Sequence, residues 1–476
     1  MLFNSLEYLV FLPLVFALFW MFKSQLNIQN LILLIASYVF YGWWDYRFLA
    51  LIAFSTIADY VISHVIERQK PQHIKKCLLI ISICINLGLL GFFKYYNFFI
   101  ESWVDIMAQV GFRSNVGSLN IILPVGISFY TFQTLSYTID VYRGDLRASR
   151  SFVNFATYVS FFPQLVAGPI ERATNLLPQF SQIKKFNNDE AIAGLNLIIW
   201  GLFQKIVIAD SCAIYVDSIF ENYEKVNSFS LLLGAIYFAF QIYGDFAGYS
   251  NIAIGTARLF GFNLMRNFNY PYFSRDIAEF WRRWHISLST WFRDYLYIPL
   301  GGSRSSMITT VRNVFIVFLV SGFWHGANWT FLVWGGIHAI LFLPVLLLGF
   351  NRKNLDQVSI SKLIPSFKEL FQMTFTFIVV SIAWVFFRAD NVTIAFKYLK
   401  RLVLDFSWGI EFLNIDRYNF ELLLLVLIVV LIEWINRTHE HPFMGTWKWF
   451  KIFIVILMLL TLGVYSDHQD FIYFQF

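Results

Sequence analysis

The chain has 476 residues, of which 58% are hydrophobic, 20% aromatic and only 14% charged. Because soluble domains carry about 25% charged residues, this composition excludes an ordinary soluble protein and predicts an all-α polytopic membrane protein. The net charge of +6 is modest. In a membrane protein such a charge arises mostly from basic cytoplasmic loops, and it does not indicate nucleic-acid binding. The three cysteines (Cys77, Cys84 and Cys212) form no CxxC pair, so we expect small core residues and neither a metal site nor a disulfide framework.

Four apolar runs fill the N-terminal part, and we expect spans over about 5–22, 29–44, 48–65 and 77–95. The first run has no preceding Lys or Arg and no small-residue cleavage site after it, which predicts a retained span. The loop between the third and fourth spans reads ERQKPQHIKK. Such a basic loop is expected to be cytoplasmic, which places the N-terminus outside.

The pattern is broken between about 96 and 180, where Pro124, Gly126, Pro163 and Gly168 interrupt apolar stretches. Prolines at these intervals break or kink helices. Broken helices are tolerated at membrane depth where they are buried in protein or line a cavity. We therefore expect short or re-entrant helices here. Interfacial ion pairs are expected from the charged residues at their ends, which are Asp140, Arg143, Glu171 and Arg172.

Two further spans are expected near 190–209 and 229–247, followed by the stretch QIYGDFAGYSNIAIG. This stretch is predicted to form a turn, and Gly244 and Gly248 have the small-residue spacing of close helix contacts. Asp245 lies in the same stretch. It is either a packing or capping device or part of a site.

Towards the C-terminus we expect spans near 330–349, 371–388, 420–435 and 449–466. The segment 390–419 contains AFKYLKRLVLDF, an amphipathic pattern typical of a helix at the membrane interface. The last ten residues contain two aspartates and no Lys or Arg. An outside C-terminus fits that composition.

The whole chain, 1–476, is predicted to be one integral membrane domain. N-terminal spans (1–95) and C-terminal spans (350–476) flank a core with broken helices (96–349). The total is about eleven to thirteen transmembrane and re-entrant helices.

Basic residues in the loop 351–370 predict a cytoplasmic loop. Counting spans back from it puts His285 on the cytoplasmic side and His325 deeper in the membrane. His338 lies about 140° from His325 round a continuous helix, so we expect it to be a core residue.

A cluster of charge and aromatic residues between Tyr270 and His338 stands out in this charge-poor chain. Read as one helix, DIAEFWRRWHISLSTWF places Arg282, His285 and Ser289 on one face. One interpretation is an interfacial helix with membrane-anchoring arginines. The other is a polar face that receives a polyanionic cosubstrate, with Arg282 and Arg283 as phosphate contacts.

His325 lies inside the apolar run VFIVFLVSGFWHGANWTFLVWGG. Gly322 and Gly326 leave little bulk around the ring, so that another group can approach it. Ser321 and Asn328, at i−4 and i+3, are placed to orient the imidazole. A neutral histidine in a low-dielectric site can act as general base towards a hydroxyl. The alternative is a histidine that is hydrogen-bonded in a helical core.

The chain contains no GxSxG, Walker A, HExxH or CxxC motif. This argues against a serine hydrolase, an ATPase or a zinc protease built on the usual patterns, and we expect no metal.

Six ordered motifs nevertheless resemble those of the membrane-bound O-acyltransferase superfamily, in its bacterial alginate O-acetyltransferase branch. The motifs are LPVGISFYTFQTLSYTIDVYRG, FFPQLVAGPIER, YGDFAGYSNIAIG, RRWHISLSTWFRDYLYIPLGG, SGFWHGANWTFLVWGGIH and WVFFRA. The chain is also similar to membrane components that O-acetylate peptidoglycan or cellulose, and more distantly to the D-alanyl transferase of teichoic acid.

The resemblance implies a ring of helices around a thinned membrane centre, with a cytoplasmic funnel that meets an outer funnel at a tunnel. It identifies His325 with the family's invariant histidine and His285 with its upstream polar residue, so both are expected to be catalytic. Arg282, Arg283 and Ser289 are expected to bind the cosubstrate. Support for the two histidines is expected from Ser321, Trp324, Asn328 and Asp245.

The resemblance further implies acetyl-CoA as a cytoplasmic cosubstrate, with no permanently bound cofactor. The acetyl group would pass to a periplasmic SGNH-type acetyltransferase, or straight to a polysaccharide, at the inner membrane of a bacterium. A different class of function, a transporter or flippase for a polysaccharide or lipid-linked sugar, also fits aromatic-rich broken helices in a lipid bilayer.

Overall fold

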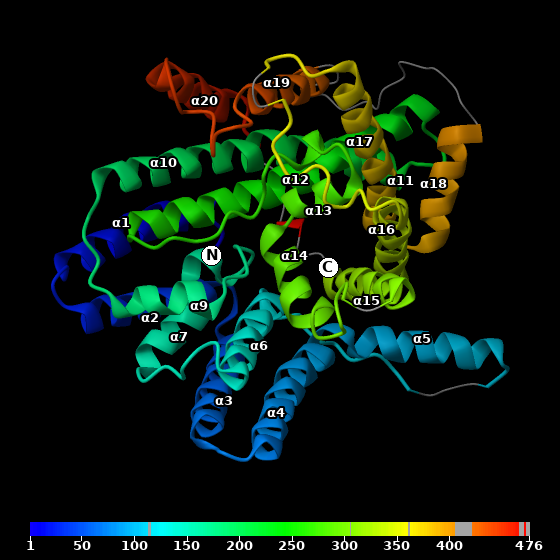
Figure 1. Ribbon diagram of the computed structural model, residues 1–476. Helices are drawn as coiled ribbons and strands as arrows, with labels where there is room; N and C mark the ends of the chain where they lie inside the picture. The colour runs from blue at the N-terminus through cyan, green and yellow to red at the C-terminus, as the bar shows by residue number, and fades with distance from the viewer. Residues whose placement is uncertain (113–115, 305, 360–361, 405–420, 466–470, 473–476) are drawn as a thin grey trace. The chain divides into compact units, whose positions relative to one another are not determined.

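A computed structural model describes the chain except residues 113–115, 305, 360–361, 405–420, 466–470 and 473–476 (Figure 1). Every regular element within the described ranges is helical. Seven helical segments of the described chain are long and apolar enough to cross a membrane, which confirms the all-α polytopic class. The chain divides into two compact units, Met1–Leu195 with Ala253–Met265, and Asn196–Ile252 with Arg266–Phe476.

The first unit holds the N-terminal helices. They are α1 (Leu6–Met21), α2 (Leu26–Asp45), η1 (Tyr46–Phe48), α3 (Leu49–Arg68), α4 (Gln72–Leu90), η2 (Gly91–Tyr95), α5 (Tyr96–Gln109), α6 (Ile127–Arg143), α7 (Phe152–Ser160), α8 (Phe162–Leu165), α9 (Ala173–Leu176) and η3 (Leu177–Ser181). The helices α10 (Asn188–Leu202) and α12 (Ser228–Leu259) contribute residues to both units.

A buried carboxylate joins α3, α4 and α6, which lie side by side (Figure 1). Asp59 accepts hydrogen bonds from Ser82 Oγ at 2.5 Å and from Asn86 Nδ2 at 2.8 Å. The Asn86 Oδ1 in turn accepts from Ser55 (2.9 Å) and Thr134 (3.0 Å). Because a buried carboxylate is costly unless it is hydrogen-bonded, this network fixes the three helices against one another.

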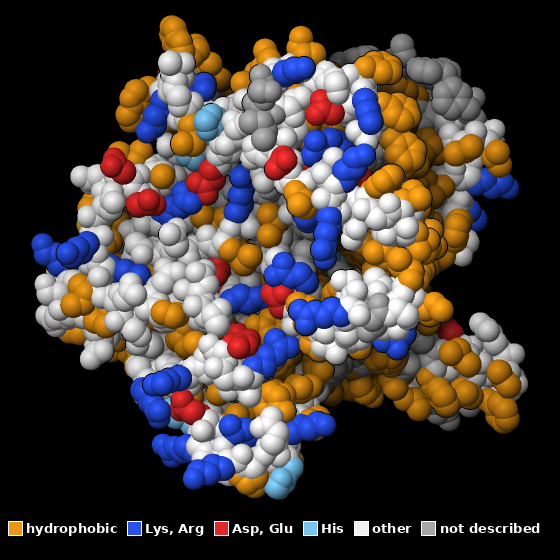
Figure 2. Space-filling model, viewed as in Figure 1, with side chains coloured by type: hydrophobic (Ala, Val, Ile, Leu, Met, Phe, Trp, Pro, Cys, Tyr) orange, Lys and Arg blue, Asp and Glu red, His pale blue; other side chains and the backbone are white. Residues whose placement is uncertain are grey.

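Arg68, Lys70 and Lys76 are exposed where α3 passes into α4, and Figure 2 shows a group of Lys and Arg side chains there. This is the loop predicted to be cytoplasmic. Two of the cysteines differ from expectation. Cys212 is buried, but Cys77 and Cys84 on α4 are exposed.

The broken region begins later than predicted. Residues 72–109 form one helical run through a π-helical turn, so the predicted end of the span at 95 is wrong. Between Gly126 and Ser181, α6 is a helix of 17 residues, whereas the elements after it, from α7 to η3, have only 4 to 9 residues, as expected. Gly126 begins α6 with φ +76°, and a Cβ there would lie 2.8 Å from the carbonyl oxygen of Leu165. Only glycine tolerates both conditions.

The second unit holds the remaining helices. They are η4 (Phe203–Ala209), α11 (Asp210–Glu221), η5 (Pro271–Phe273), α13 (Ile277–Arg283), α14 (Ile286–Phe292), η6 (Arg293–Tyr297), α15 (Met307–His325), α16 (Trp329–Leu347), α17 (Phe367–Arg388), α18 (Val392–Leu404), α19 (Glu421–Ile435) and α20 (Lys448–Leu462). The predicted spans at 330–349 and 371–388 agree with α16 and α17, which are long and apolar enough to cross a membrane. The predicted spans at 420–435 and 449–466 coincide with α19 and α20, but these helices have only 15 residues each and are not among the seven candidate spans of the described chain. The rest of the amphipathic stretch (405–419) and the aspartates Asp467 and Asp470 lie outside the described residues.

The predicted turn around Asp245 is wrong, because α12 continues through it to Leu259. The reason is close packing. A Cβ on Gly244 would lie 2.8 Å from the carbonyl oxygen of Gln204, and one on Gly248 would lie 2.7 Å from that of Gly201. The glycines therefore serve helix–helix contact inside a continuous helix, as their spacing predicted.

The helices α15 and α16 pack as an antiparallel pair, in which Gly322 approaches Phe331 and Gly335 approaches Phe318. A Cβ on Gly322 would collide with the backbone carbonyl of Phe331, and one on Gly326 with the ring of Phe331. The expectation that these glycines leave room for another molecule beside His325 is therefore wrong. The space they leave is filled by α16.

Candidate active site

The helix predicted across the charged stretch is interrupted in its middle. The helix α13 ends at Arg283 and is followed by Trp284, whose ψ of +128° is extended; α14 begins after His285, whose φ is +43°. The prediction that Arg282, His285 and Ser289 share one helix face is therefore wrong. A non-glycine residue in the left-handed region costs of order 1 kcal/mol and persists only where its surroundings hold it.

Asn267 holds His285 in this conformation. Its backbone carbonyl accepts from the Ile286 N–H at 2.9 Å, and its Oδ1 accepts from Ser287 Oγ at 2.9 Å. His285 Nδ1 lies 3.0 Å from the same Oδ1, while Asn267 Nδ2 donates to Ser250 Oγ at 3.1 Å. With Oδ1 as the acceptor, Nδ1 carries the hydrogen and Nε2 carries the lone pair.

Burial of the His285 ring lowers its pKa well below the usual range. The imidazole is therefore neutral at physiological pH. Asn267 was not predicted. It stands 18 residues before His285 in the chain, in a segment without a motif of its own, and only the hydrogen bonds identify it.

His325 is the last residue of α15, is buried, and lies within an aromatic cage. The ring packs edge-on against Trp324, Trp334 and Phe387, at centroid distances of 5.0, 5.2 and 5.4 Å. The centroid of the His285 ring is 6.5 Å away. The two predicted histidines are thus brought together, one from the start of α14 and the other from the end of α15.

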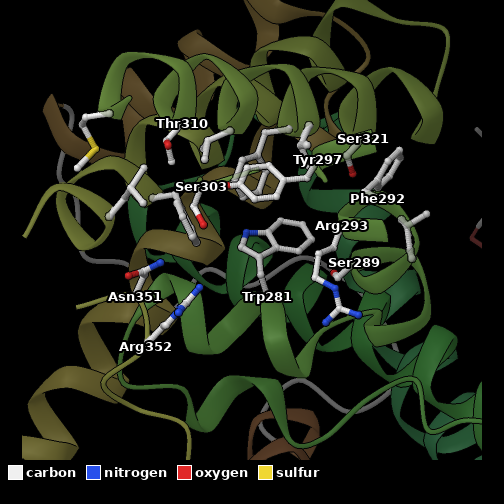
Figure 3. A pocket seen from close by; sticks show the side chains of 17 residues that line it. Trp281, Ser289, Phe292, Arg293, Tyr297, Ser303, Thr310, Ser321, Asn351 and Arg352 are labelled. Carbon is white, nitrogen blue, oxygen red and sulfur yellow. The ribbon is translucent and has the colours of Figure 1, made fainter. Parts of the chain in front are cut away.

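A cavity of about 580 Å³ opens beside these helices (Figure 3). Such a volume suits a small-molecule ligand. Ser289, one turn after His285, lines it from α14, and Ser321, one turn before His325, lines it from α15. Its interior is largely apolar, whereas Arg293 and Arg352 also line it. The two helices that carry the histidines therefore also form two walls of one pocket.

Tryptophan side chains stand between this pocket and His325. Trp281 lines the pocket and donates its indole N–H to His338 Nδ1 at 3.3 Å. Its ring is 5.7 Å from that of Trp334, which contacts His325. His338 is completely buried, as expected for a core residue, and its hydrogen bond orients Trp281.

The two predicted phosphate-binding arginines have other partners. Arg282 donates to the carbonyl oxygens of Asn351 and Asn354, both at 2.8 Å. Arg283 is buried and donates to Glu279 Oε1 at 2.7 Å. Both guanidinium groups are therefore engaged within the protein: Arg282 binds backbone carbonyls of the loop after α16, and Arg283 binds the carboxylate of Glu279. The assignment of both arginines to phosphate therefore has no support in these contacts.

The supporting residues fall in several places. Asn328 caps α16, since its Oδ1 accepts from the Thr330 N–H (3.0 Å) and its Nδ2 donates to the Asp390 carbonyl (2.9 Å). Both polar atoms of that amide are thus engaged away from His325. Trp324 belongs to the aromatic cage, and Ser321 belongs to the pocket wall.

Asp245 forms a buried ion triad with Lys205 and Asp210, with both N–O distances at 2.8 Å. It also accepts from the backbone N–H of Ile472 at 2.6 Å. These contacts favour the packing interpretation of Asp245. The next residue, Phe246, packs edge-on against His285 with 4.6 Å between the ring centroids. The triad therefore fixes the helix turn that carries this aromatic contact to His285.

The chain belongs to the membrane-bound O-acyltransferase (MBOAT) family, whose model matches residues 145–385. A "Probable alginate O-acetylase AlgI" from Azotobacter vinelandii is 38% identical over 94% of this chain and 88% of that protein. The protein of the same name from Pseudomonas aeruginosa is 40% identical over 87% of this chain and 77% of its own length. A "Peptidoglycan O-acetyltransferase" from Helicobacter pylori is 33% identical over 98% of this chain and 90% of that protein.

The protein is therefore a multi-pass membrane acyltransferase. The predicted family and class of enzyme are confirmed, and the transporter alternative is set aside. The expected ring of helices around a tunnel stays a prediction, as do the individual roles of the site residues.

Proposed function

We propose that this protein takes an acetyl group from acetyl-CoA and supplies it for O-acetylation of a polysaccharide outside the cytoplasm. An alginate-type polymer is the first candidate and peptidoglycan is the next, in keeping with the names of the relatives. Cellulose, which the sequence motifs also suggest, is a further candidate. The observation that carries the proposal is the pairing of two buried histidine rings at 6.5 Å, on the two helices that wall the pocket.

The two buried histidines support acyl transfer to a hydroxyl. His325 takes the proton of the acceptor hydroxyl, whose oxygen attacks the thioester carbonyl carbon. The C–S bond then breaks, and the thiolate of CoA receives a proton, which leaves an acetyl ester and free CoA. Transient transfer of the acetyl group to the His325 ring is an alternative form of the same step.

His285 assists at the thioester. Its neutral ring presents Nε2, because Asn267 Oδ1 engages Nδ1. A buried neutral imidazole can accept a proton without first losing one to solvent. Its position at the head of α14, one turn from the pocket-lining Ser289, supports a role for it beside the acyl end of a bound donor.

The lining of the pocket supports acetyl-CoA as its ligand. Its largely apolar interior fits the pantetheine arm, and the exposed Arg293 and Arg352 fit the phosphates. Arg352 belongs to a basic loop of the kind that faces the cytoplasm. We place the donor site on the cytoplasmic side of a bacterial inner membrane, with both chain termini periplasmic.

The acceptor then lies on the opposite side. The acetyl group passes to a periplasmic acetyltransferase of the SGNH type, which acetylates the polymer, or passes directly to the polymer.

The test uses purified full-length protein in detergent with radiolabelled acetyl-CoA. We expect turnover or acetyl exchange that His325→Ala reduces by at least about 100-fold, the scale of a lost general base. His73→Ala, at an exposed position on α4, is the matched control and should retain wild-type turnover. Full activity in a correctly inserted His325→Ala protein would exclude the proposed role, and wild-type protein that never consumes acetyl-CoA would overturn the function.

A further inference from the structure

The loop after α16 is hydrogen-bonded to α13 and to the two residues that precede this helix. Arg282 Nη1 and Nη2 donate to the carbonyl oxygens of Asn351 and Asn354, each at 2.8 Å. Arg275 Nη2 donates to the carbonyl of Asp356 at 2.7 Å. The Asn354 side chain donates to Asp276 Oδ2, also at 2.7 Å. Arg283 Nη2 also donates to the Asp356 carbonyl, at 3.4 Å. Residues 351–356, which we call the clamped loop, are thus tied by five hydrogen bonds to residues 275–283, which comprise α13 and the two residues before it.

The chain beyond the clamped loop is anchored separately. The guanidinium of Arg437 is almost fully buried and donates to the carbonyl oxygens of Val358 at 3.0 Å and Ser359 at 2.5 Å. Arginine reaches two or three carbonyl groups at once because its donors form a planar fork. The loop backbone is therefore held from both ends.

This attachment determines where the side chain of Arg352 lies relative to the pocket. Asn351 and Arg352 line the pocket, and Figure 3 shows Arg352 on the other side of Trp281 from Arg293. Arg293 forms an ion pair with Asp294 at 2.7 Å. The side chain of Arg352 is exposed, and Arg282 holds the carbonyl groups of Asn351, directly before it, and of Asn354, two residues after it.

We propose that Arg352 binds a phosphate group of the nucleotide part of acyl-CoA, and that Arg282 is a positioning residue that holds Arg352 at the pocket mouth through the loop backbone. The inference rests on the proposed function for the identity of the ligand. It gives Arg282 an indirect role in cosubstrate binding, in place of the direct phosphate contact predicted from its sequence position.

The first part is tested by binding of CoA and of 3′-dephospho-CoA to the full-length protein in detergent. Arg352→Gln should weaken CoA binding about tenfold and make the affinity less sensitive to salt. Lys353→Gln is the matched control. It removes the same charge from the next residue, whose ammonium lies 4.9 Å over the Phe350 ring, and should change CoA affinity less than about twofold.

The comparison of the two ligands identifies the phosphate. If Arg352 contacts the 3′-phosphate, Arg352→Gln removes the preference for CoA over 3′-dephospho-CoA. If it contacts the pyrophosphate, both ligands weaken alike. Unchanged affinity for both ligands in Arg352→Gln would overturn the site.

The second part is tested by steady-state kinetics. Arg282→Gln should raise KM for acetyl-CoA about tenfold with kcat unchanged, and the double variant with Arg352→Gln should be no worse than Arg352→Gln alone. Effects of the two substitutions that multiply would show that Arg282 binds phosphate itself, which contradicts the positioning role.

Two further variants test the same positioning role in case the Arg282→Gln protein does not fold. Arg282→Lys retains the charge but not the fork, and should raise KM to an intermediate value. Asn354→Ala frees the same loop through Asp276 and should raise KM in the same direction. Normal KM in Asn354→Ala and in Arg282→Lys would contradict the clamp.

The outcomes also separate this inference from the proposed function. Wild-type protein that neither binds CoA nor consumes acetyl-CoA defeats the proposed function. Normal wild-type turnover, together with CoA binding that is insensitive to Arg352, defeats only this inference.

Discussion

Substituting Gly335 by alanine should separate α15 from α16 and so weaken both the fold and the site. A Cβ at Gly335 would collide with the carbonyl oxygen of Phe318 and would lie 3.1 Å from its carbonyl carbon and 3.4 Å from Leu319 Cα. All three atoms belong to the α15 backbone and cannot rotate away. The helices would have to move apart by roughly 1 Å, because interiors are closely packed.

The magnitude follows from two opposing contributions. Alanine in place of glycine favours a helix by about 1 kcal/mol. Overpacking costs about 1–3 kcal/mol, and the upper part of that range applies because the obstacle is backbone. We therefore expect Gly335→Ala to lower the free energy of unfolding by about 1–2 kcal/mol.

The adjacent Gly336 offers a matched control. A Cβ there would meet only Leu319 Cδ2, at 3.9 Å, which is an ordinary contact. Gly336→Ala should therefore be neutral or stabilising by up to about 1 kcal/mol. The two variants differ by one residue in position and not at all in composition.

The assays are thermal unfolding in detergent and acetyl-CoA turnover. Because α15 carries His325 at its end, a shift of roughly 1 Å should lower the turnover of Gly335→Ala by about 10-fold or more. If Gly335→Ala matches Gly336→Ala in both stability and turnover, the packing argument for this helix pair is refuted.

Three other predictions concern the pocket, the histidine and pH. Trp281→Ala, which removes the indole between pocket and cage, should lower the preference for acetyl-CoA over butyryl-CoA about tenfold, measured as the ratio of kcat/KM values. Asn267→Ala removes the partner of His285 Nδ1 and should lower kcat about 10- to 100-fold, with KM for acetyl-CoA changed less than about twofold; unchanged kcat would exclude the orienting role. Burial raises the pKa of Glu171 from 4.5 to about 7. The folded protein therefore favours the protonated carboxyl: its contribution to stability is fully present below pH 4.5 and is lost as pH rises through 7. The free energy of unfolding should fall by about 3 kcal/mol over that range. Glu171→Gln should remove that pH dependence from thermal unfolding between pH 5 and 8.

The sequence by itself determined the membrane class, most helix positions and the two histidines. Apolar runs report spans directly, because each backbone group in lipid must be satisfied within its own helix, whatever the neighbours are. The histidines were visible for a similar reason. An ionisable residue within an apolar run, such as His325, is energetically costly to insert into a membrane, so its presence there indicates a functional site.

Contacts between distant residues were not readable in the same way. The stretch around His285 contains no Pro or Gly and has the periodicity of a single helix, so local reasoning predicted no break. The break is stabilised by Asn267, 18 residues earlier, through hydrogen bonds to the residues that follow it. A prediction that considers only neighbouring residues cannot detect a stabilising hydrogen-bond partner at that distance along the chain.

The arginines illustrate the same limit. Charge and spacing predicted that Arg282 would be available for a ligand, but its partners are carbonyl groups about seventy residues further along the chain. Backbone carbonyls carry no sequence signature, since every residue has one. Only the tertiary structure decided that Arg282 holds the chain while Arg352 lines the pocket, because it alone determines which loop lies against which helix.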